Sequence, residues 1–164
     1  MLATAIREAN PEDARSIANI YNHYIENTVI TFDTETISTD AMHHKIAELQ
    51  DKYPVLVITC DNEVAGFAYG SSWKTKTAYK YCAETTIYMH PSFQSKGLGI
   101  RLYRAVLASL PLFDIVNAIA CITVPNDASI KLHEKLGFRR VGRFDKVGYK
   151  KETWIDVEYW QKQV

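Results

Sequence analysis

Residues 83–110, AETTIYMHPSFQSKGLGIRLYRAVLASL, predict a β-strand, a loop and an amphipathic helix in immediate succession. The strand occupies 83–90 and the helix begins at Leu98. A second apolar stretch, IVNAIACITV at 115–124, predicts a buried strand directly after the helix. Two strands that are joined by a helix in this way pair in parallel. The stretch therefore predicts the parallel centre of a mixed α/β sheet.

The loop at 91–97 has the chemistry of an anion site. It leaves the carboxyl end of a strand and enters a helix, so its backbone N–H groups and the positive end of the helix dipole point the same way. Gly97 and Gly99 allow positive φ and close approach of a ligand. The arrangement suits a pyrophosphate, although neither the Walker nor the Rossmann pattern is present. The pattern that is present, Gln94-x-x-Gly97-x-Gly99, is equally typical of a flexible turn before a helix.

The remaining segments predict helices and antiparallel strands around this centre. NPED at 10–13 is typical of a helix start, and apolar residues at helical spacing follow it and recur at 42–49. Residues 54–70 predict two strands joined by a tight turn. A short helix within 125–138 ends at Gly137, and two more strands follow in the tail. The expected order is helices, an antiparallel meander, strand–helix–strand–helix and two strands.

Composition places the chain among globular proteins and argues against several partners. The 164 residues predict one domain, 1–164, with 47% apolar residues and a net charge of zero. Zero net charge argues against nucleic acid, although ten tyrosines leave single-stranded RNA as a minor alternative. No apolar run is long enough to span a membrane. Because the N-terminus shows no secretory signal, we expect a cytoplasmic protein.

Cysteine and histidine spacing predicts neither a disulfide nor a metal site. Cys60, Cys82 and Cys121 are odd in number, lie far apart and form no C-x-x-C pair, so we expect reduced thiols. Cys121 lies in an apolar strand and is expected in the core. His43 and His44 are adjacent on a predicted helix, point about 100° apart and are expected at the surface.

Two linked motifs resemble the Gcn5-related N-acetyltransferase (GNAT) superfamily. The first is IYMHPSFQSKGLGIRLY at 87–103, and the second, after one more strand, is VPNDASIKLHEKLGF at 124–138. Longer runs at 27–38, 73–99 and 147–161 look like its phosphinothricin and methionine sulfoximine N-acetyltransferase subfamily. The resemblance implies an α/β fold with a mixed, mostly antiparallel sheet, a central splayed parallel pair and flanking helices.

The resemblance further implies transfer of an acetyl group from acetyl-CoA to the α-amine of an amino-acid-like substrate. The loop amides would hold the CoA pyrophosphate. The end of the preceding strand would offer backbone groups to the pantetheine arm, and an Asn after the next strand would bind nearby. By this resemblance the cofactor-binding residues are Ile87, Tyr88, Met89, Gln94, Ser95, Lys96, Gly97, Leu98, Gly99, Ile100 and Asn126.

Two residues are candidates for acid–base catalysis. The attacking amine must be neutral, so a base is needed. The resemblance assigns this role to Glu84, whereas the residues alone favour a strand-end carboxylate that is solvated or paired with Lys80. His133 stands where many relatives have Tyr and the subfamily has His. It is expected to act as an acid, as a second base or as a polar helix residue that faces the cleft. The N–H of Met89 would stabilise the oxyanion.

The acceptor site is expected around WKTK at 73–76, because a substrate carboxylate needs cationic partners; exposed lysines are, however, ordinarily solvated. The expected substrate-binding residues are Phe32, Lys74, Thr75, Lys76, Glu84, Thr85, Thr86 and Tyr88. The resemblance also implies a homodimer that binds a small-molecule amine, with no nucleic acid, membrane or metal. Open alternatives are a GNAT enzyme for another amine (a polyamine, an aminoglycoside or a peptide N-terminus) and a non-catalytic acetyl-CoA-binding module.

Overall fold

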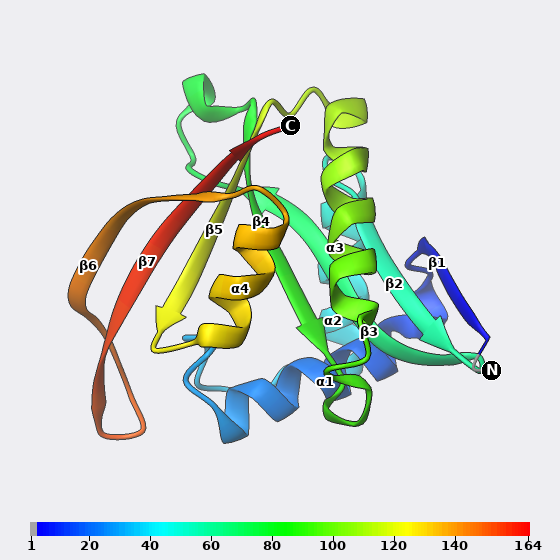
Figure 1. The fold of residues 1–164 in the computed structure, drawn as a ribbon. Coiled ribbons are helices and arrows are strands. Elements are labelled where there is room, and N and C mark those ends of the chain that lie inside the picture. The colour runs from blue at the N-terminus through cyan, green and yellow to red at the C-terminus, as the bar shows by residue number, and fades with distance from the viewer. Residues whose placement is uncertain (1–2) are drawn as a thin grey trace.

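The computed structural model describes residues 3–164, which form a seven-stranded sheet with helices on both faces (Figure 1). The strands are β1 (Thr4–Glu8), β2 (Val55–Cys60), β3 (Glu63–Ser72), β4 (Cys82–Met89), β5 (Asn117–Val124), β6 (Arg139–Lys150) and β7 (Thr153–Gln163). The α-helices are α1 (Ala14–Asn27), α2 (Thr39–Gln50), α3 (Leu98–Ser109) and α4 (Asp127–Lys135). Short 3₁₀ turns lie at η1 (Pro11–Asp13), η2 (Thr77–Tyr79), η3 (Pro91–Phe93) and η4 (Leu110–Phe113).

The sheet has the order β1-β2-β3-β4-β5-β7-β6, and β4 and β5 pair in parallel at its centre. The other neighbouring strands are antiparallel. The expected mixed sheet with a central parallel pair and flanking helices is therefore confirmed. The strand β1 corrects the expected order, in which helices came first. It has only five residues, and among them only Ile6 packs on the core, so its sequence carries little strand periodicity.

Each face of the sheet has its own apolar core, because successive residues of a strand point to opposite faces. On one face, Leu102 and Val106 of α3 pack against alanines of the central strands. On the other face, Ile17 and Ile20 of α1 pack against Val57 of β2. Burial of a large aliphatic side chain contributes about 1.5–3 kcal/mol. These contacts fix α1 and α2 on one face, and α3 with α4 on the other (Figure 1).

β4 and β5 stop pairing partway along their length. Their parallel register ends at Glu84 and Ile119, although β4 continues to Met89 and β5 continues to Val124. The Thr85 hydroxyl lies 3.2 Å from the Ile119 carbonyl oxygen and bridges the strands where the main-chain ladder ends. Beyond this point the two strands part, and the gap between them is the centre of the candidate site.

The expectation that Cys121 lies in the core is wrong, because its side chain is exposed. Its neighbours Ala120 and Ile122 face α3 and are buried. Cys121 points to the opposite face, where α1 and α2 mainly contact β2, β3 and β4. An apolar run in the sequence does not reveal which side of a strand borders a gap. All three cysteines are free, as expected.

The local signals for helix ends are confirmed. Asn10 and Asp13 form a reciprocal capping box before α1, and Gly137 has a φ of 82° directly after α4. His43 and His44 are exposed on α2, as expected. No helix within residues 3–164 is both long and apolar enough to cross a membrane.

Candidate active site

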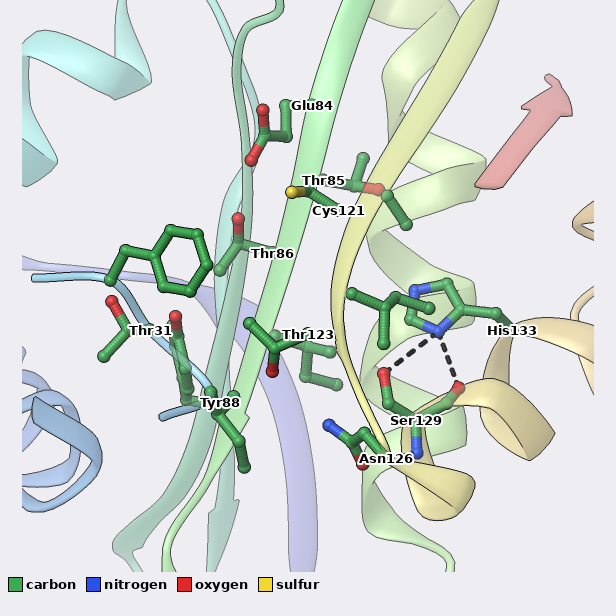
Figure 2. Close-up of a pocket in the computed structure, with 15 residues that line it drawn as sticks. Thr31, Glu84, Thr85, Thr86, Tyr88, Cys121, Thr123, Asn126, Ser129 and His133 are labelled. Atoms are coloured by element: carbon green, nitrogen blue, oxygen red, sulfur yellow. Dashed lines mark hydrogen bonds between the residues drawn. The ribbon is translucent and has the colours of Figure 1, made fainter. Parts of the chain in front are cut away.

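A cavity of about 230 Å³ occupies the gap where β4 and β5 part. Figure 2 shows Glu84 near the end at which the strands are still paired and Asn126 towards the other end, with β5 passing between Glu84 and His133. The lining side chains come from the segment before α2, from β4, from β5 and from the region of α4. They are Ile30, Thr31, Phe32, Glu84, Thr85, Thr86, Ile87, Tyr88, Ala120, Cys121, Ile122, Thr123, Asn126, Ser129 and His133.

The cavity connects the two faces of the sheet. Tyr88 packs with the α1 core, so Glu84 and Thr86, at even spacing along the same strand, point to that face as well. Thr85 points to the opposite face, where it bonds Tyr103 of α3. His133 of α4 lies on this second face too. A ligand in the gap is therefore accessible to Glu84 from one face and to the α3/α4 side from the other.

The edge of β4 that borders the gap carries main-chain groups that β5 does not pair. The N–H of His90 donates to the Ala65 carbonyl at 2.8 Å, so the even-numbered residues of β4 form the hydrogen-bonded pairs with β3. The main-chain groups of Ile87 and Met89 therefore point into the gap. The Tyr24 hydroxyl donates to the Met89 carbonyl at 2.6 Å. The N–H groups of Ile87 and Met89 can bind an extended ligand.

Glu84 is the titratable group at the paired end of the gap. Burial raises the pKa of its carboxyl, and the Lys74 ammonium opposes this rise. Lys74, rather than the Lys80 considered from the sequence, is the cation that acts on Glu84. A carboxylate with a raised pKa is a better proton acceptor. Burial, followed by the charge of Glu84, raises the pKa of the Cys121 thiol to about 11, so this thiol is protonated at neutral pH.

Both ring nitrogens of His133 are bound by the protein. Nδ1 donates to the Ser129 carbonyl at 2.7 Å, and Nε2 lies 3.0 Å from the Tyr103 hydroxyl. That hydroxyl lies 2.7 Å from the Thr85 hydroxyl. Burial lowers the pKa of the imidazole, although the bond to Ser129 opposes this. The neutral ring with its proton on Nδ1 is thus favoured, and Nε2, which then carries no proton, faces the Tyr103 hydroxyl.

The loop after β4 presents backbone N–H groups at the start of α3. Ser95 and Gly97 have φ values of 60° and 74°, and Gly97 is the N-cap of α3 without a side-chain cap bond. The first N–H groups of the helix are therefore open to an anion. Gln94 Nε2 donates to the Tyr24 hydroxyl at 2.8 Å, so the loop and the end of β4 share one anchor on α1.

The structure brings some predicted residues together and separates others. Those that line the cavity are Phe32, Glu84, Thr85, Thr86, Ile87, Tyr88, Asn126 and His133. Met89 and the loop residues Gln94 to Ile100 follow at the end of β4, outside this lining. Lys74, Thr75 and Lys76 line a separate hollow of about 440 Å³ together with Lys52 and Lys80.

Sequence reasoning missed several residues that shape the site. Thr31, Cys121 and Ser129 line the cavity, and Tyr103 holds His133. Tyr103 occupies a core position of an amphipathic helix, so its sequence signal is that of a packing residue. The alternation of side chains between the two faces of β5 was the sequence signal that could have identified Cys121 as a lining residue. Within residues 3–164, no three His, Cys, Asp or Glu side chains are grouped so that they could hold a metal ion.

Comparison with known proteins identifies relatives of the chain. The family described as "Acetyltransferase (GNAT) domain" matches residues 6–159. The chain is 38% identical to a phosphinothricin N-acetyltransferase of Streptomyces viridochromogenes, over 96% of this chain and 86% of the relative. It is 32% identical to an L-methionine sulfoximine/L-methionine sulfone acetyltransferase of Salmonella typhimurium, over 97% and 94% of the two chains. The solved structure of yncA from Salmonella typhimurium, with its cofactor acetyl-CoA, superposes with a TM-score of 0.96 at 32% identity, over 98% and 94% of the two chains.

The match over most of its length shows that the chain belongs to the GNAT acetyltransferase family. Its relatives are N-acetyltransferases named for phosphinothricin and for methionine sulfoximine. The resemblance of the sequence motifs to this family and subfamily is thereby confirmed. The chain is an N-acetyltransferase of this family.

Proposed function

We propose that this enzyme transfers the acetyl group of acetyl-CoA to the α-amine of an amino-acid-like substrate of the phosphinothricin, methionine sulfoximine or methionine sulfone type. The names of the relatives support this substrate class. The observation that carries the proposal is the gap through the sheet, with Glu84 at its paired end. Two bound substrates can meet through such a gap from opposite faces and react by proximity.

The α3/α4 face would bind acetyl-CoA, which supplies the activated acyl group. The N–H groups of residues 95–100 suit its pyrophosphate because they stand at the uncapped start of α3. The gap-facing main-chain groups of Ile87 and Met89 would pair with the amides of its pantetheine arm. Asn126 uses its side-chain oxygen to cap α4 by accepting from the Ser129 N–H, so its NH₂ group would remain for the same arm.

On the α1 face, Glu84 would be the general base. The amine of a free amino acid is mostly protonated at neutral pH, so transfer of that proton to the carboxylate, directly or through a water, exposes the attacking lone pair. Burial raises the pKa of Glu84, which suits this role. The N–H of Met89 would stabilise the oxyanion. Cys121 is not required as a nucleophile, and a thiol with a pKa of about 11 is poorly suited to that role.

His133 would support the site rather than give up a proton. A neutral imidazole whose single proton lies on Nδ1 and is donated to the Ser129 carbonyl has no proton free for the leaving thiolate. Of the three roles expected from the sequence, a polar residue at the cleft wall is the one that these contacts favour. Through Tyr103, His133 would hold Thr85 at the edge of the gap.

The acceptor would lie between Phe32, Thr86 and Tyr88 on the α1 side of the cavity. Its carboxylate needs a cation. Lys74 acts on Glu84 although it lines the separate lysine-rich hollow, so it would draw the carboxylate towards Glu84. Thr75 and Lys76 on the same segment would complete this anion site.

The substrate class is tested by thiol release from acetyl-CoA with a panel of amines. We expect release with methionine sulfoximine, methionine sulfone or phosphinothricin, and none with spermidine or a short peptide. Glu84→Gln should lower kcat about a hundredfold while the acetyl-CoA Kd stays unchanged. Thiol release only with spermidine or the peptide would show that the acceptor belongs to another class of amine. CoA binding without release from any amine would favour the non-catalytic module.

The cofactor loop is tested at Gly97, where an added Cβ would meet no atom within 4 Å. Gly97→Asn keeps the left-handed backbone accessible but places a side chain in front of the amides. We expect the acetyl-CoA Kd to rise about tenfold or more, with the thermal midpoint nearly unchanged. Gly142→Ala is the control, since that glycine also has open space around it. If calorimetry gave the same acetyl-CoA affinity for the wild type and for Gly97→Asn, the loop would not belong to the cofactor site.

A change at Lys74 should move the pH dependence of the reaction. The Lys74 ammonium lowers the pKa of Glu84, so Lys74→Met raises that pKa further. A base works only when it is deprotonated, and kcat/KM therefore falls as pH drops through its pKa. We expect the acidic limb of the kcat/KM profile at higher pH in Lys74→Met. Lys74→Arg keeps the charge and serves as control. A limb at the same pH in all three proteins would contradict the assignment of Glu84.

We further propose that the enzyme is a homodimer in the cytoplasm. The β6–β7 hairpin carries several exposed apolar side chains, a grouping that is typical of interfaces. Tyr149 and Trp154 form a cross-strand pair with ring centroids 4.9 Å apart, and Trp154 is 60% exposed. Phe144 and Val147 on the same hairpin are also more than half exposed. The free cysteines fit a reducing compartment.

The dimer is tested by light scattering during size exclusion. We expect the wild type to have twice the chain mass, and Trp154→Ala to raise the dimer Kd about tenfold or more. Leu112→Ala is the matched control, because Leu112, at 84%, is the most exposed large apolar residue within residues 3–164 but lies on η4. A monomeric wild type, or equal dissociation of the two variants, would count against the hairpin as the interface.

A further inference from the structure

The acceptor side of the cavity is closed by residues 28–38, which form neither helix nor strand and which we call the acceptor loop. Ile30, Thr31 and Phe32 of this loop line the cavity together with Thr86 and Tyr88 of β4, and Figure 2 shows Thr31 on the side of Tyr88, away from β5 and His133. Because the loop has no ladder bonds, contacts that involve side chains largely keep its shape. The contacts that hold this loop therefore decide the shape of the acceptor pocket.

Helix α1 holds the loop from one side. The Tyr21 hydroxyl lies 3.1 Å from the Thr31 hydroxyl and also donates to Asp33. The Asn22 side chain donates to the Ile37 carbonyl at 2.9 Å and accepts from the Ile37 N–H at 2.8 Å. These bonds fasten Thr31, Asp33 and Ile37 of the acceptor loop to α1, but they do not reach Phe32.

A lysine from the far end of the chain holds the loop from the other side. Lys150, the last residue of β6, is 6% exposed. Its Nζ donates to the carbonyl oxygen of Thr31 at 2.8 Å, across 119 positions of sequence. A buried ammonium is costly unless it is hydrogen-bonded. The bond to the Thr31 carbonyl therefore stabilises both Lys150 and the acceptor loop. Asp33 adds an opposite charge nearby.

Two positions before Lys150, a glycine receives the ring of Phe32. A Cβ at Gly148 would overlap the Cζ and Cε atoms of Phe32, so the ring packs directly on the backbone of β6. The sequence contains seven glycines, and this one is needed for a close approach rather than for its φ. Lys150 and Gly148 together contact the two neighbouring loop residues that line the cavity.

The position of these two residues is set by the hairpin tip. Lys150 pairs with Thr153, and Lys151 and Glu152 form the two-residue turn between them with φ values of 52° and 59°. A register shift between Phe144 and Gly148 bends β6 just before the tip. The tip is therefore a short, tightly constrained element whose inner face lies on the acceptor loop.

We propose that Lys150 and Gly148 are positioning residues that clamp the acceptor loop, keep Phe32 at the cavity wall and thereby set the affinity and size selectivity for the acceptor. This inference rests on the proposed function, because it assumes that the acceptor occupies the α1 side of the cavity. The contacts of these two residues are with Thr31 and Phe32, and neither residue lines the cavity beside Glu84. Their loss should therefore weaken acceptor binding and leave acetyl-CoA binding intact.

The first test compares Lys150→Met with Lys151→Met. Lys150→Met removes the ammonium but keeps most of the apolar stem. We expect faster hydrogen–deuterium exchange in peptides covering 28–38, and a KM for methionine sulfone raised about tenfold with an unchanged KM for acetyl-CoA. Lys151 is the matched control, since its Nζ donates to the Glu26 carbonyl on α1 and not to the acceptor loop. Lys151→Met should leave both readouts at wild-type values.

The second test is a double-mutant cycle between Gly148 and Phe32. Gly148→Ala should displace the Phe32 ring and raise the KM for methionine sulfone. In a Phe32→Ala background the same change should have little effect, because the overlapping ring is gone. Independent, additive effects of the two substitutions would overturn the contact as the means of positioning.

The outcomes separate this inference from the proposed function. Unchanged exchange in Lys150→Met would overturn the clamp, and faster exchange with an unchanged acceptor KM would overturn its positioning role. A wild-type enzyme that releases no thiol with methionine sulfone or its analogues would defeat the proposed acceptor class. In that case the exchange comparison between Lys150→Met and Lys151→Met still shows whether the clamp exists.

Discussion

The structure depends on the point at which β4 and β5 stop pairing. Neighbouring parallel strands normally continue their ladder, because a buried main-chain group without a partner costs free energy. Here the ladder ends at Glu84 and Ile119, and side chains replace part of it. The Thr85 hydroxyl bonds the Ile119 carbonyl, and a tyrosine hydroxyl bonds the carbonyl of Met89. The gap is thus a stabilised feature, and the groups left over along β4 can bind a ligand.

At the point where the β4–β5 ladder ends, the two faces of the sheet carry different chemical groups. Alternation along β4 places Glu84 on the α1 face and Thr85 on the α3 face. Partial burial raises the pKa of Glu84 where a base is useful, while burial keeps His133 neutral and bonded on the other side. The two titratable residues are therefore separated by β5 and do not act as a hydrogen-bonded pair.

The two sides of the site differ in how far the sequence could predict them. Glu84, the glycine loop and Asn126 lie within one continuous strand–helix–strand unit, so motif spacing predicts their neighbourhood. Thr31 and Lys150 meet only after the whole sheet has formed, across 119 positions, and no periodicity links them. The exposure of Cys121 escaped prediction for a related reason, because it depends on a gap that exists only in three dimensions.

If the proposed assignments hold, acyl transfer and acceptor choice rest on separate contacts. The break in the β4–β5 ladder and the start of α3 depend on residues 82–124, whereas the acceptor wall depends on a loop before α2 and on the tip of the β6–β7 hairpin. A substitution at Gly148 changes the space for Phe32 without touching the main chain of β4. Under the proposed function, a fold arranged in this way would exchange one amino-acid acceptor for another at the hairpin tip while it presents the thioester in the same manner.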